Sequence, residues 1–208
     1  MDRIKYTYEN LIRHSNSICI TSRKSLRHDI DKIKGVFSFL DHHFSYLEGL
    51  PKSLQKNVKM ALSCRFINHL FSYLTLVERG LYFDAAICLR SVTEVIAMYW
   101  LVCVDEASAC LYNDEKSPRP VEIRRKLESL GCDITDIKDA YGTLSGISHV
   151  GNRNDSLHID WIGTGRDGLL QVGGGENTKR QKQMLEEINR ALLLFIRYED
   201  QYEISRSE

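Results

Sequence analysis

The sequence predicts a mainly α-helical, single-domain bundle with a small β-hairpin before its last helix. Several segments repeat apolar residues at three- and four-residue spacing, the period of a helix buried along one face. The length of 208 residues suits one domain with a sizeable core. Residues 156–172 break the helical period and alternate around TGRDG, which is typical of a β-hairpin.

The first long helix is predicted over residues 22–48, followed by the helix-ending residues Gly49 and Pro51. Residues 4–20 have a weaker helical pattern, interrupted by SNS. We therefore expect an N-terminal arm, residues 1–21, that packs on the bundle or on another subunit, and a bundle domain over residues 22–208. The apolar stripe of the long helix, spaced alternately four and three residues apart, comprises Leu26, Ile30, Ile33, Phe37, Leu40, Phe44 and Leu47.

A second helix is predicted from about residue 57 to residue 78, with Gly80 as its C-terminal stop. His69 falls on its expected apolar face. We interpret His69 as a hydrogen-bonded core or interface histidine, and catalysis is the alternative. The other residues expected on this face are Leu62, Phe66, Tyr73 and Leu76.

A third helix, over about 82–104, is apolar nearly all round, which predicts the buried centre of the domain. It has the length of a membrane span, but Arg90 and Glu94 near its middle favour a bundle helix. These two charges are four residues apart and share a helix face. We expect them to be buried together as a pair, because an unpaired charge there would cost several kcal/mol.

Three further helices are predicted towards the C-terminus. Residues 117–131 form a short helix with proline in its first turn and Gly131 after its end. The last helix begins at Thr178, where TKRQ matches a capping box. Between them a helix over about 133–151 has Ile134, Ile137, Tyr141, Leu144 and Ile147 on its inner side; the last helix buries Leu185, Ile188, Leu192 and Phe195.

The balance of charged residues and the positions of the cysteines limit the kinds of function that the sequence supports. The 28 basic residues balance 28 acidic ones, so any nucleic-acid site must be local. No two of the six cysteines form a CxxC pair, and Cys64, Cys88 and Cys103 lie in apolar runs, which favours reduced, buried thiols and a cytoplasmic protein. The N-terminus has no secretory signal, and we expect no metal site, no cofactor and no membrane association.

The segment RNDSLH combines Arg153, Asn154 and His158. Metal-independent RNA cleavage needs a histidine to move the proton of the ribose 2′-hydroxyl and a cation or amide to hold the charge on the phosphate. His158 would be the acid or base, Arg153 the clamp and Asn154 a positioning donor. An arginine and a histidine at this spacing are expected about 1.6 times by chance, and about 0.07 times once asparagine must follow the arginine. The alternative is an ordinary polar turn.

Two longer motifs carry a family resemblance. GLYFDAAICLRSVTEVIAMYWL contains R-S-x-x-E, and AYGTLSGISH, some fifty residues later, ends in L-S-x-x-x-H. Over about residues 57–160 the chain resembles a family of bacterial helical domains related to HEPN proteins. The resemblance implies an α-helical bundle, often dimeric, found among toxin and phage-defence genes, with ribonuclease activity where an arginine-histidine pair is kept. The histidine at the matching helix end is His149, which has no arginine five to seven positions before it.

A second polar set draws on two of the helices. Tyr141, Ser145 and His149 fall at four-residue steps, and with Arg90 and Glu94 they form one cluster if the helices pack side by side. The cluster is interpreted as a structural network or as a ligand-binding or catalytic site. The expected function is a metal-independent, RNA-cleaving toxin or phage-defence effector; the alternative is a non-catalytic helical interaction module. We expect a homodimer, with RNA as substrate and an antitoxin or defence-system protein as partner.

Overall fold

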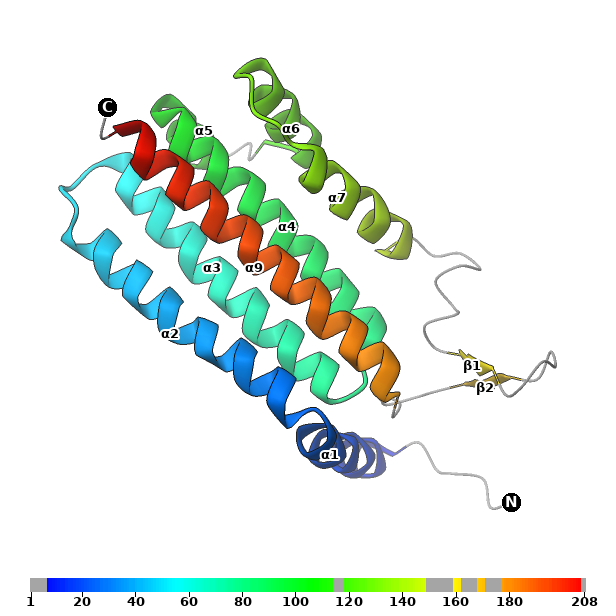
Figure 1. The fold of residues 1–208 in the computed structure, drawn as a ribbon. Helices are drawn as coiled ribbons and strands as arrows, with labels where there is room; N and C mark the ends of the chain where they lie inside the picture. Colours follow the sequence, from blue (N-terminus) through cyan, green and yellow to red (C-terminus); the bar gives the residue numbers. More distant parts are fainter. Residues whose placement is uncertain (1–6, 114–117, 149–158, 162–167, 171–176, 207–208) are drawn as a thin grey trace.

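The protein is described by a computed structural model that covers residues 7–113, 118–148, 159–161, 168–170 and 177–206. It is a bundle of long, roughly parallel and antiparallel helices, with the first helix lying across one end (Figure 1). The described helices are α1 (Tyr8–Ser25), α2 (Arg27–Gly49), α3 (Leu54–Glu78), α4 (Tyr82–Val104), the 3-10 turn η1 (Glu106–Ser108), α5 (Ala109–Asn113), α6 (Pro120–Ser129), α7 (Thr135–Ser148) and α9 (Thr178–Arg206).

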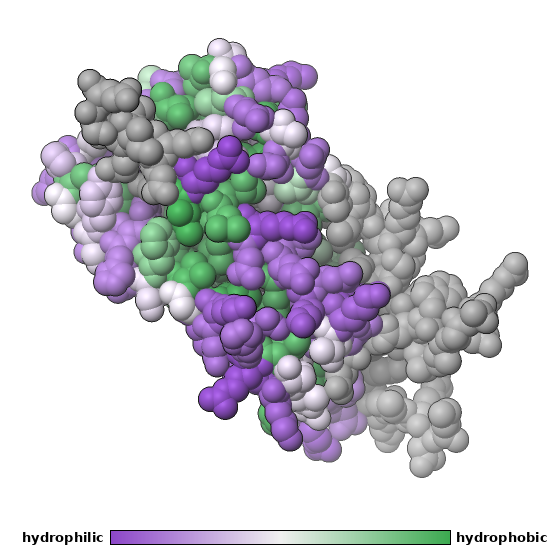
Figure 2. All heavy atoms as spheres, in the orientation of Figure 1, coloured by the Kyte–Doolittle hydropathy of each residue, from purple (hydrophilic) through white to green (hydrophobic). Residues whose placement is uncertain are grey.

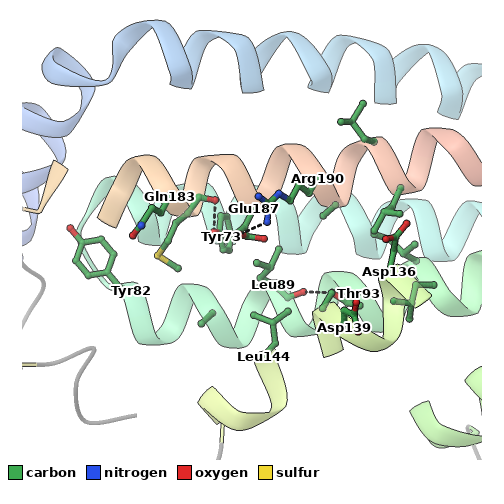
Figure 3. Close-up of a pocket in the computed structure, with 18 of the residues that line it drawn as sticks. Tyr73, Tyr82, Leu89, Thr93, Asp136, Asp139, Leu144, Gln183, Glu187 and Arg190 are labelled. Carbon is green, nitrogen blue, oxygen red and sulfur yellow. Dashed lines mark hydrogen bonds and ion pairs between the residues drawn. The ribbon is translucent and has the colours of Figure 1, made fainter. Parts of the chain in front are cut away.

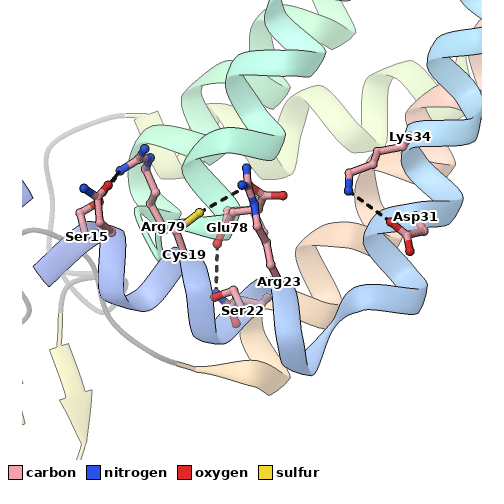
Figure 4. A network of polar contacts seen from close by, with 11 residues as sticks. Ser15, Cys19, Ser22, Arg23, Asp31, Lys34, Glu78 and Arg79 are labelled. Atoms are coloured by element: carbon pink, nitrogen blue, oxygen red, sulfur yellow. Dashed lines mark hydrogen bonds and ion pairs between the residues drawn. The ribbon is translucent and has the colours of Figure 1, made fainter. Parts of the chain in front are cut away.

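The N-terminal segment is a complete helix, and the predicted start of the first long helix at residue 22 is wrong. α1 continues through SNS to Ser25, and the chain turns at Leu26 before α2 begins. Ser15 and Asn16 do not interrupt α1, because both bind a partner at the end of α3. Arg79 donates to Ser15 Oγ and Asn16 Oδ1, and Arg23 pairs with Glu78, so polar contacts fix α1 to the end of α3 (Figure 4).

The predicted stripe of α2 is largely confirmed. Five of its seven residues are buried, whereas Phe37 and Phe44 are half-buried at its edge. α2 ends at Gly49, as the glycine and Pro51 predicted. The stripe therefore gives the correct face of the helix, although its first residue, Leu26, belongs to the turn.

α3 and α4 are joined by a tight turn in which Gly80 has a φ of 70°, the left-handed conformation that glycine adopts without strain. Leu62, Phe66 and Tyr73 of α3 are buried as predicted. Leu76 is half-buried and packs against the edge of the core, as Phe37 of α2 does, and His69 is half-buried and accepts a hydrogen bond from Arg65. The fully buried stripe also includes Leu70 and Val77, at three- and four-residue steps.

α4 is the central helix, as its composition predicted. It packs against α3, α6, α7 and α9. Among the described helices it alone is long and apolar enough to cross a membrane, and most of that apolar stretch is buried inside the bundle. The core around it includes aromatic stacks that join α9 to the rest of the bundle: Phe195 on Phe66, with ring centroids 4.4 Å apart, and Tyr198 on Trp100 at 3.8 Å.

The segment after α4 contains two short helical elements that the polar sequence did not predict, η1 and α5. Ser108 and Ala109 are buried in them. Asp105 accepts a hydrogen bond from Ser108 Oγ at 2.6 Å and pairs with Lys126 of α6 at 2.7 Å. These contacts hold the pKa of Asp105 below its usual value. α6 itself begins at Pro120 and is followed by Gly131 at a φ of 78°, as predicted.

The predicted hairpin region contains two described strands, β1 (Ile159–Trp161) and β2 (Gly168–Leu170). They pair in antiparallel register with Ile159 opposite Leu170. The chain between them lies outside the described residues.

The last helix, α9, starts at Thr178 and buries the four residues predicted for it. The capping residue, however, is Asn177, whose Oδ1 accepts from the backbone N–H of Arg180 at 2.9 Å. The predicted capping box headed by Thr178 is therefore wrong. Asparagine one position earlier fills the same role, because a cap needs a side-chain oxygen on the residue that precedes the first helical turn.

Candidate functional site

The predicted contact between Arg90, Glu94 and Tyr141 is present where α4 meets α7. Arg90 Nε lies 3.2 Å from Glu94 Oε1, and Arg90 Nη2 donates to the Tyr141 hydroxyl at 2.9 Å. The prediction that the pair is buried is wrong, because the two side chains are 26% and 27% exposed. They lie on the strip of α4 that its described neighbours leave open to solvent.

Tyr141 also connects this pair to α6. The guanidinium carbon of Arg124 lies 4.0 Å from the centroid of the Tyr141 ring, and that of Arg90 lies 5.1 Å away. A cation close to an aromatic ring is attracted by the negative potential of the ring face. One tyrosine therefore holds two guanidinium groups, one from α4 and one from α6.

His69 extends the cluster to α3. Its Nε2 accepts a hydrogen bond from Arg65 Nε at 3.3 Å. Burial, and then the positive charge of Arg65, lower the pKa of His69, while the Glu94 carboxylate acts in the opposite direction. His69 is therefore neutral at pH 7, and the field of Glu94 reaches it from the Arg90 pair.

We call this set the arginine band: Arg65, His69, Arg90, Glu94, Arg124 and Tyr141. The set contains three guanidinium groups, one carboxylate and one histidine whose pKa is lowered, an excess of two positive charges within the set (3 − 1) on a chain with no net charge. Guanidinium groups bind phosphate oxygens in a planar, two-pronged geometry. The band is therefore suited to a phosphate-rich ligand.

The other predicted site residues are not placed by the structure. His149, Arg153, Asn154 and His158 lie outside the described residues. Ser145 belongs to α7, but its side chain is outside the described part.

Two residues of the band, Arg65 and Arg124, were missed in the sequence, and His69 was given a catalytic role only as the alternative. Arg65 and His69 are four residues apart on one helix face, a spacing that predicts contact. Arg124 gives no such signal, because its position depends on how α6 packs against α4.

No group of three or more His, Cys, Asp and Glu residues suited to a metal ion occurs in the part of the chain that the structure describes. The cysteines predicted to be buried are not alike. Cys103 is buried and Cys88 is half-buried, with the pKa of its thiol raised by burial, but Cys64 is exposed on α3.

A second feature is an apolar cavity between α7 and α9. Both helices pack on α4, and the space between them is a cavity of about 690 Å³ (Figure 3). We call it the α7–α9 groove. Figure 2 shows an apolar area flanked by hydrophilic residues on the face that carries α9. The groove is lined by Ala86, Leu89, Thr93 and Ile96 of α4, Ile137, Ala140 and Leu144 of α7, and Met184, Ala191 and Leu194 of α9.

Charged residues line the rims of the groove. α7 contributes Asp136 and Asp139, whereas α9 contributes Arg180, Arg190 and Arg197, together with Glu187. Arg197 reaches across to Asp136 at 3.6 Å. Arg180 lies over the Tyr82 ring with its guanidinium carbon 5.4 Å from the centroid. The groove thus combines an apolar floor with an acidic rim and a mainly basic one.

Comparison with protein-family models, with curated proteins and with solved structures finds no match for this chain. The functional argument therefore depends on the chemistry of the arginine band and of the α7–α9 groove.

Proposed function

We propose that the protein is a metal-independent endoribonuclease and that the arginine band binds the phosphate at which RNA is cut. The observation that carries the proposal is the contact of the half-buried His69, whose Nε2 accepts a hydrogen bond from Arg65 Nε; burial and Arg65 also lower the pKa of His69, which favours its neutral form. A neutral histidine next to guanidinium groups combines a base with cations for the charge that develops on a phosphate.

The reaction uses the ribose 2′-hydroxyl as nucleophile. Arg65 turns from His69 to a phosphate oxygen, which frees the Nε2 lone pair to take the 2′-hydroxyl proton. The 2′-oxygen then bonds to phosphorus as the bond to the 5′-oxygen breaks, and a second group returns a proton to that oxygen. The products are a 2′,3′-cyclic phosphate and a 5′-hydroxyl end. Arg65 and Arg90 stabilise the negative charge that builds up on the phosphate oxygens in the transition state.

The proton donor in this proposal is His158 or His149, with Arg153 and Asn154 as further phosphate-binding groups. α7 carries Tyr141 of the band and is followed directly by the segment that contains these residues. The resemblance to HEPN-related proteins adds the biological setting, a toxin or phage-defence effector in the cytoplasm with an antitoxin or defence-system protein as partner.

The test is RNA cleavage in the presence of EDTA. Wild-type protein is expected to cut RNA and leave 2′,3′-cyclic phosphate ends, and His69→Ala to lose that activity. His42→Ala, an exposed histidine on α2, is the matched control and should remain active. His158→Ala and Arg153→Ala then show whether RNDSLH contributes. The proposal is rejected if wild type leaves RNA intact, or if His69→Ala cuts as fast as wild type.

The second candidate is a non-catalytic interaction module. It is favoured by the contacts of Arg90, which is already held by Glu94 and by Tyr141, as in a network that only fixes how helices pack. In that case the band is architectural and the α7–α9 groove is the functional surface. Absence of RNA cleavage together with retention of a stable partner would favour this candidate.

A further inference from the structure

We propose that the α7–α9 groove binds a fatty-acid carboxylate, with the head group against Arg180 and the hydrocarbon chain along the floor of the groove. The inference does not depend on the proposed ribonuclease activity. It rests on three properties of the groove: its narrow section, its apolar floor and the different charges at its two ends.

The groove is long and narrow. Its lining runs from Tyr82 to Ile96 on α4 and from Arg180 to Arg197 on α9, about 21 and 26 Å at 1.5 Å per residue. A volume of about 690 Å³ over those lengths gives a mean cross-section of about 27–33 Å² (690 divided by 26 and by 21). An α-helix with its side chains is about 10–12 Å across, or roughly 80–110 Å² in section. The groove is therefore too narrow for a helix, whereas a single extended hydrocarbon chain is thin enough to enter it.

The floor of the groove is apolar, and its hydroxyl groups donate within the chain. Leu89 of α4 and Leu144 of α7 are among the apolar side chains that form it. The Tyr73 hydroxyl donates to the carbonyl of Met184 at 2.7 Å, and the Thr93 hydroxyl donates to the carbonyl of Leu89 at 3.1 Å (Figure 3). Polar groups along the body of a ligand would lose water there without gaining equivalent partners, which costs free energy. The body of the ligand is therefore hydrocarbon.

The Tyr82 end of the groove is suited to an anionic head group. Arg180 is the charged residue that the described lining contributes at this end, and its guanidinium lies over the Tyr82 ring. Tyr82 is 2% exposed, and its hydroxyl accepts from the backbone N–H of Asn177 at 3.1 Å, so the ring beneath the guanidinium is held in place. A guanidinium group binds a carboxylate through two parallel N–H donors.

The opposite end of the groove disfavours an anion. Asp136 and Asp139 of α7 lie there, far from Tyr82 (Figure 3). Arg197 already pairs with one of these carboxylates at 3.6 Å, and along the rim between the ends Arg190 pairs with Glu187 at 2.9 Å. Two carboxylates repel a third, so the charges orient the ligand with its head at the basic end and its methyl group towards the acidic end.

Isothermal titration calorimetry with octanoate, decanoate and dodecanoate is the first measurement. One molecule should bind per chain, with a negative heat-capacity change because apolar surface is buried. Each added methylene should tighten binding by up to about four-fold, which corresponds to about 0.8 kcal/mol per buried methylene. Dodecyltrimethylammonium has the same chain length and a cationic head, and it should bind about ten-fold more weakly than dodecanoate, or worse.

Arg180→Glu tests the head-group contact. Dodecanoate should bind this variant about ten-fold more weakly, or worse, because a charged hydrogen-bonding partner is replaced by a like charge. Dodecyltrimethylammonium should then bind more tightly than dodecanoate. Lys182→Glu is the matched control: Lys182 is exposed two residues away on α9, outside the groove lining, and its replacement changes the net charge equally. This variant should bind dodecanoate within about two-fold of wild type, since salt screens an exposed charge.

Ala140→Phe tests the position of the chain. Ala140 is half-buried in the α7 wall of the groove, so a phenyl ring there narrows the groove and dodecanoate binding should be lost. Ala61→Phe, at an exposed position of α3 outside the lining, is the matched control and should bind as wild type does. Circular dichroism of each variant separates loss of binding from loss of folding. If Ala140→Phe does not fold, the comparison of Arg180→Glu with Lys182→Glu decides.

Four results would overturn the proposal: no binding of dodecanoate, equal affinity for dodecyltrimethylammonium, equal affinities of Arg180→Glu and Lys182→Glu, or a folded Ala140→Phe that binds as wild type does. RNA cleavage is measured on the same proteins without amphiphile. Failure of the groove to bind and failure of the proposed activity are therefore seen separately.

Discussion

The Tyr141 hydroxyl shows how one side chain connects helices distant in sequence. Tyr141→Phe keeps the ring between the two guanidinium groups and removes only the acceptor for Arg90 Nη2. We expect the free energy of unfolding to fall by about 0.5–1.5 kcal/mol, as for one hydrogen bond. Urea denaturation measures this. Tyr8→Phe, at a 74% exposed position, should change the stability very little. Equal losses of unfolding free energy in both variants would show that the hydrogen bond between Arg90 and Tyr141 does not stabilise the fold.

His69 should make folding depend on pH. Its pKa is lower in the folded protein than in the unfolded chain, because burial and Arg65 disfavour the charged ring. The unfolded chain therefore takes up the proton first as pH falls. Stability associated with His69 is complete above the unfolded pKa of about 6.5 and is lost as pH falls from there towards the folded value.

The measurement compares urea denaturation of wild type and His69→Gln between pH 8 and pH 5. The loss of stability on acidification should be smaller in the variant, since glutamine does not titrate. Other histidines contribute equally to both proteins and cancel in the difference. Parallel curves for the two proteins would show that His69 is not perturbed by folding.

At the scale of secondary structure, two glycines are expected to respond oppositely to alanine. Gly35 is exposed inside α2, and a Cβ there meets no atom within 4 Å. Gly35→Ala should raise stability by about 0.5–1 kcal/mol, since alanine favours the helix and restricts the unfolded chain. Gly131 has equally open space but a φ of 78°. Gly131→Ala should lower stability by about 1–2 kcal/mol, because L-residues are strained there. Thermal melts of both variants check the signs.

The sequence predicted helices correctly where the spacing of apolar residues or a helix-ending residue depends only on nearby positions in the chain. The α2 stripe, the apolar α4 and the glycines after α3 and α6 all depend on neighbours within a few positions. The continuation of α1 through SNS was missed, because Ser15 and Asn16 look like a helix interruption until Arg79 is known to bind them. Tertiary contacts of this kind override local preference.

The candidate site was predictable to a similar extent. The contact of Arg90 with Glu94 follows from their spacing, and Tyr141 follows once α7 packs beside α4. Their partial exposure and the approach of Arg124 depend on which surfaces the other helices cover. The sequence of a single segment does not predict which of its surfaces another helix covers.

At the scale of the whole molecule, α1 is joined to the bundle by few contacts, of which the buried carboxylate of Glu78 is central. Arg23 donates to it at 2.7 Å, and the Cys19 thiol donates at 3.7 Å (Figure 4). Burial, and then the negative charge of Glu78, raise the pKa of Cys19, so its thiol is protonated and unreactive.

Arg23→Met leaves the Glu78 carboxylate without its cation and should release α1 while the remaining helices stay folded. Iodoacetamide should then modify Cys19 several-fold faster than in wild type, as followed by peptide mass spectrometry. Cys103, buried in α4, should stay slow in both proteins, and the exposed Cys64 should stay fast. Faster modification of Cys103 as well would indicate global unfolding instead of release of α1.

The stack of Phe195 on Phe66 has a consequence for synthesis on the ribosome. The two rings are 129 positions apart (195 − 66), and chains grow at roughly 5–20 residues per second, so Phe66 waits roughly 6–26 s for its partner. During that interval α3 and α4 can form their hairpin, but the surfaces later covered by α9 face solvent. The nascent chain thus has a time window in which chaperones that bind apolar segments would be expected to engage it, and that window closes when α9 docks.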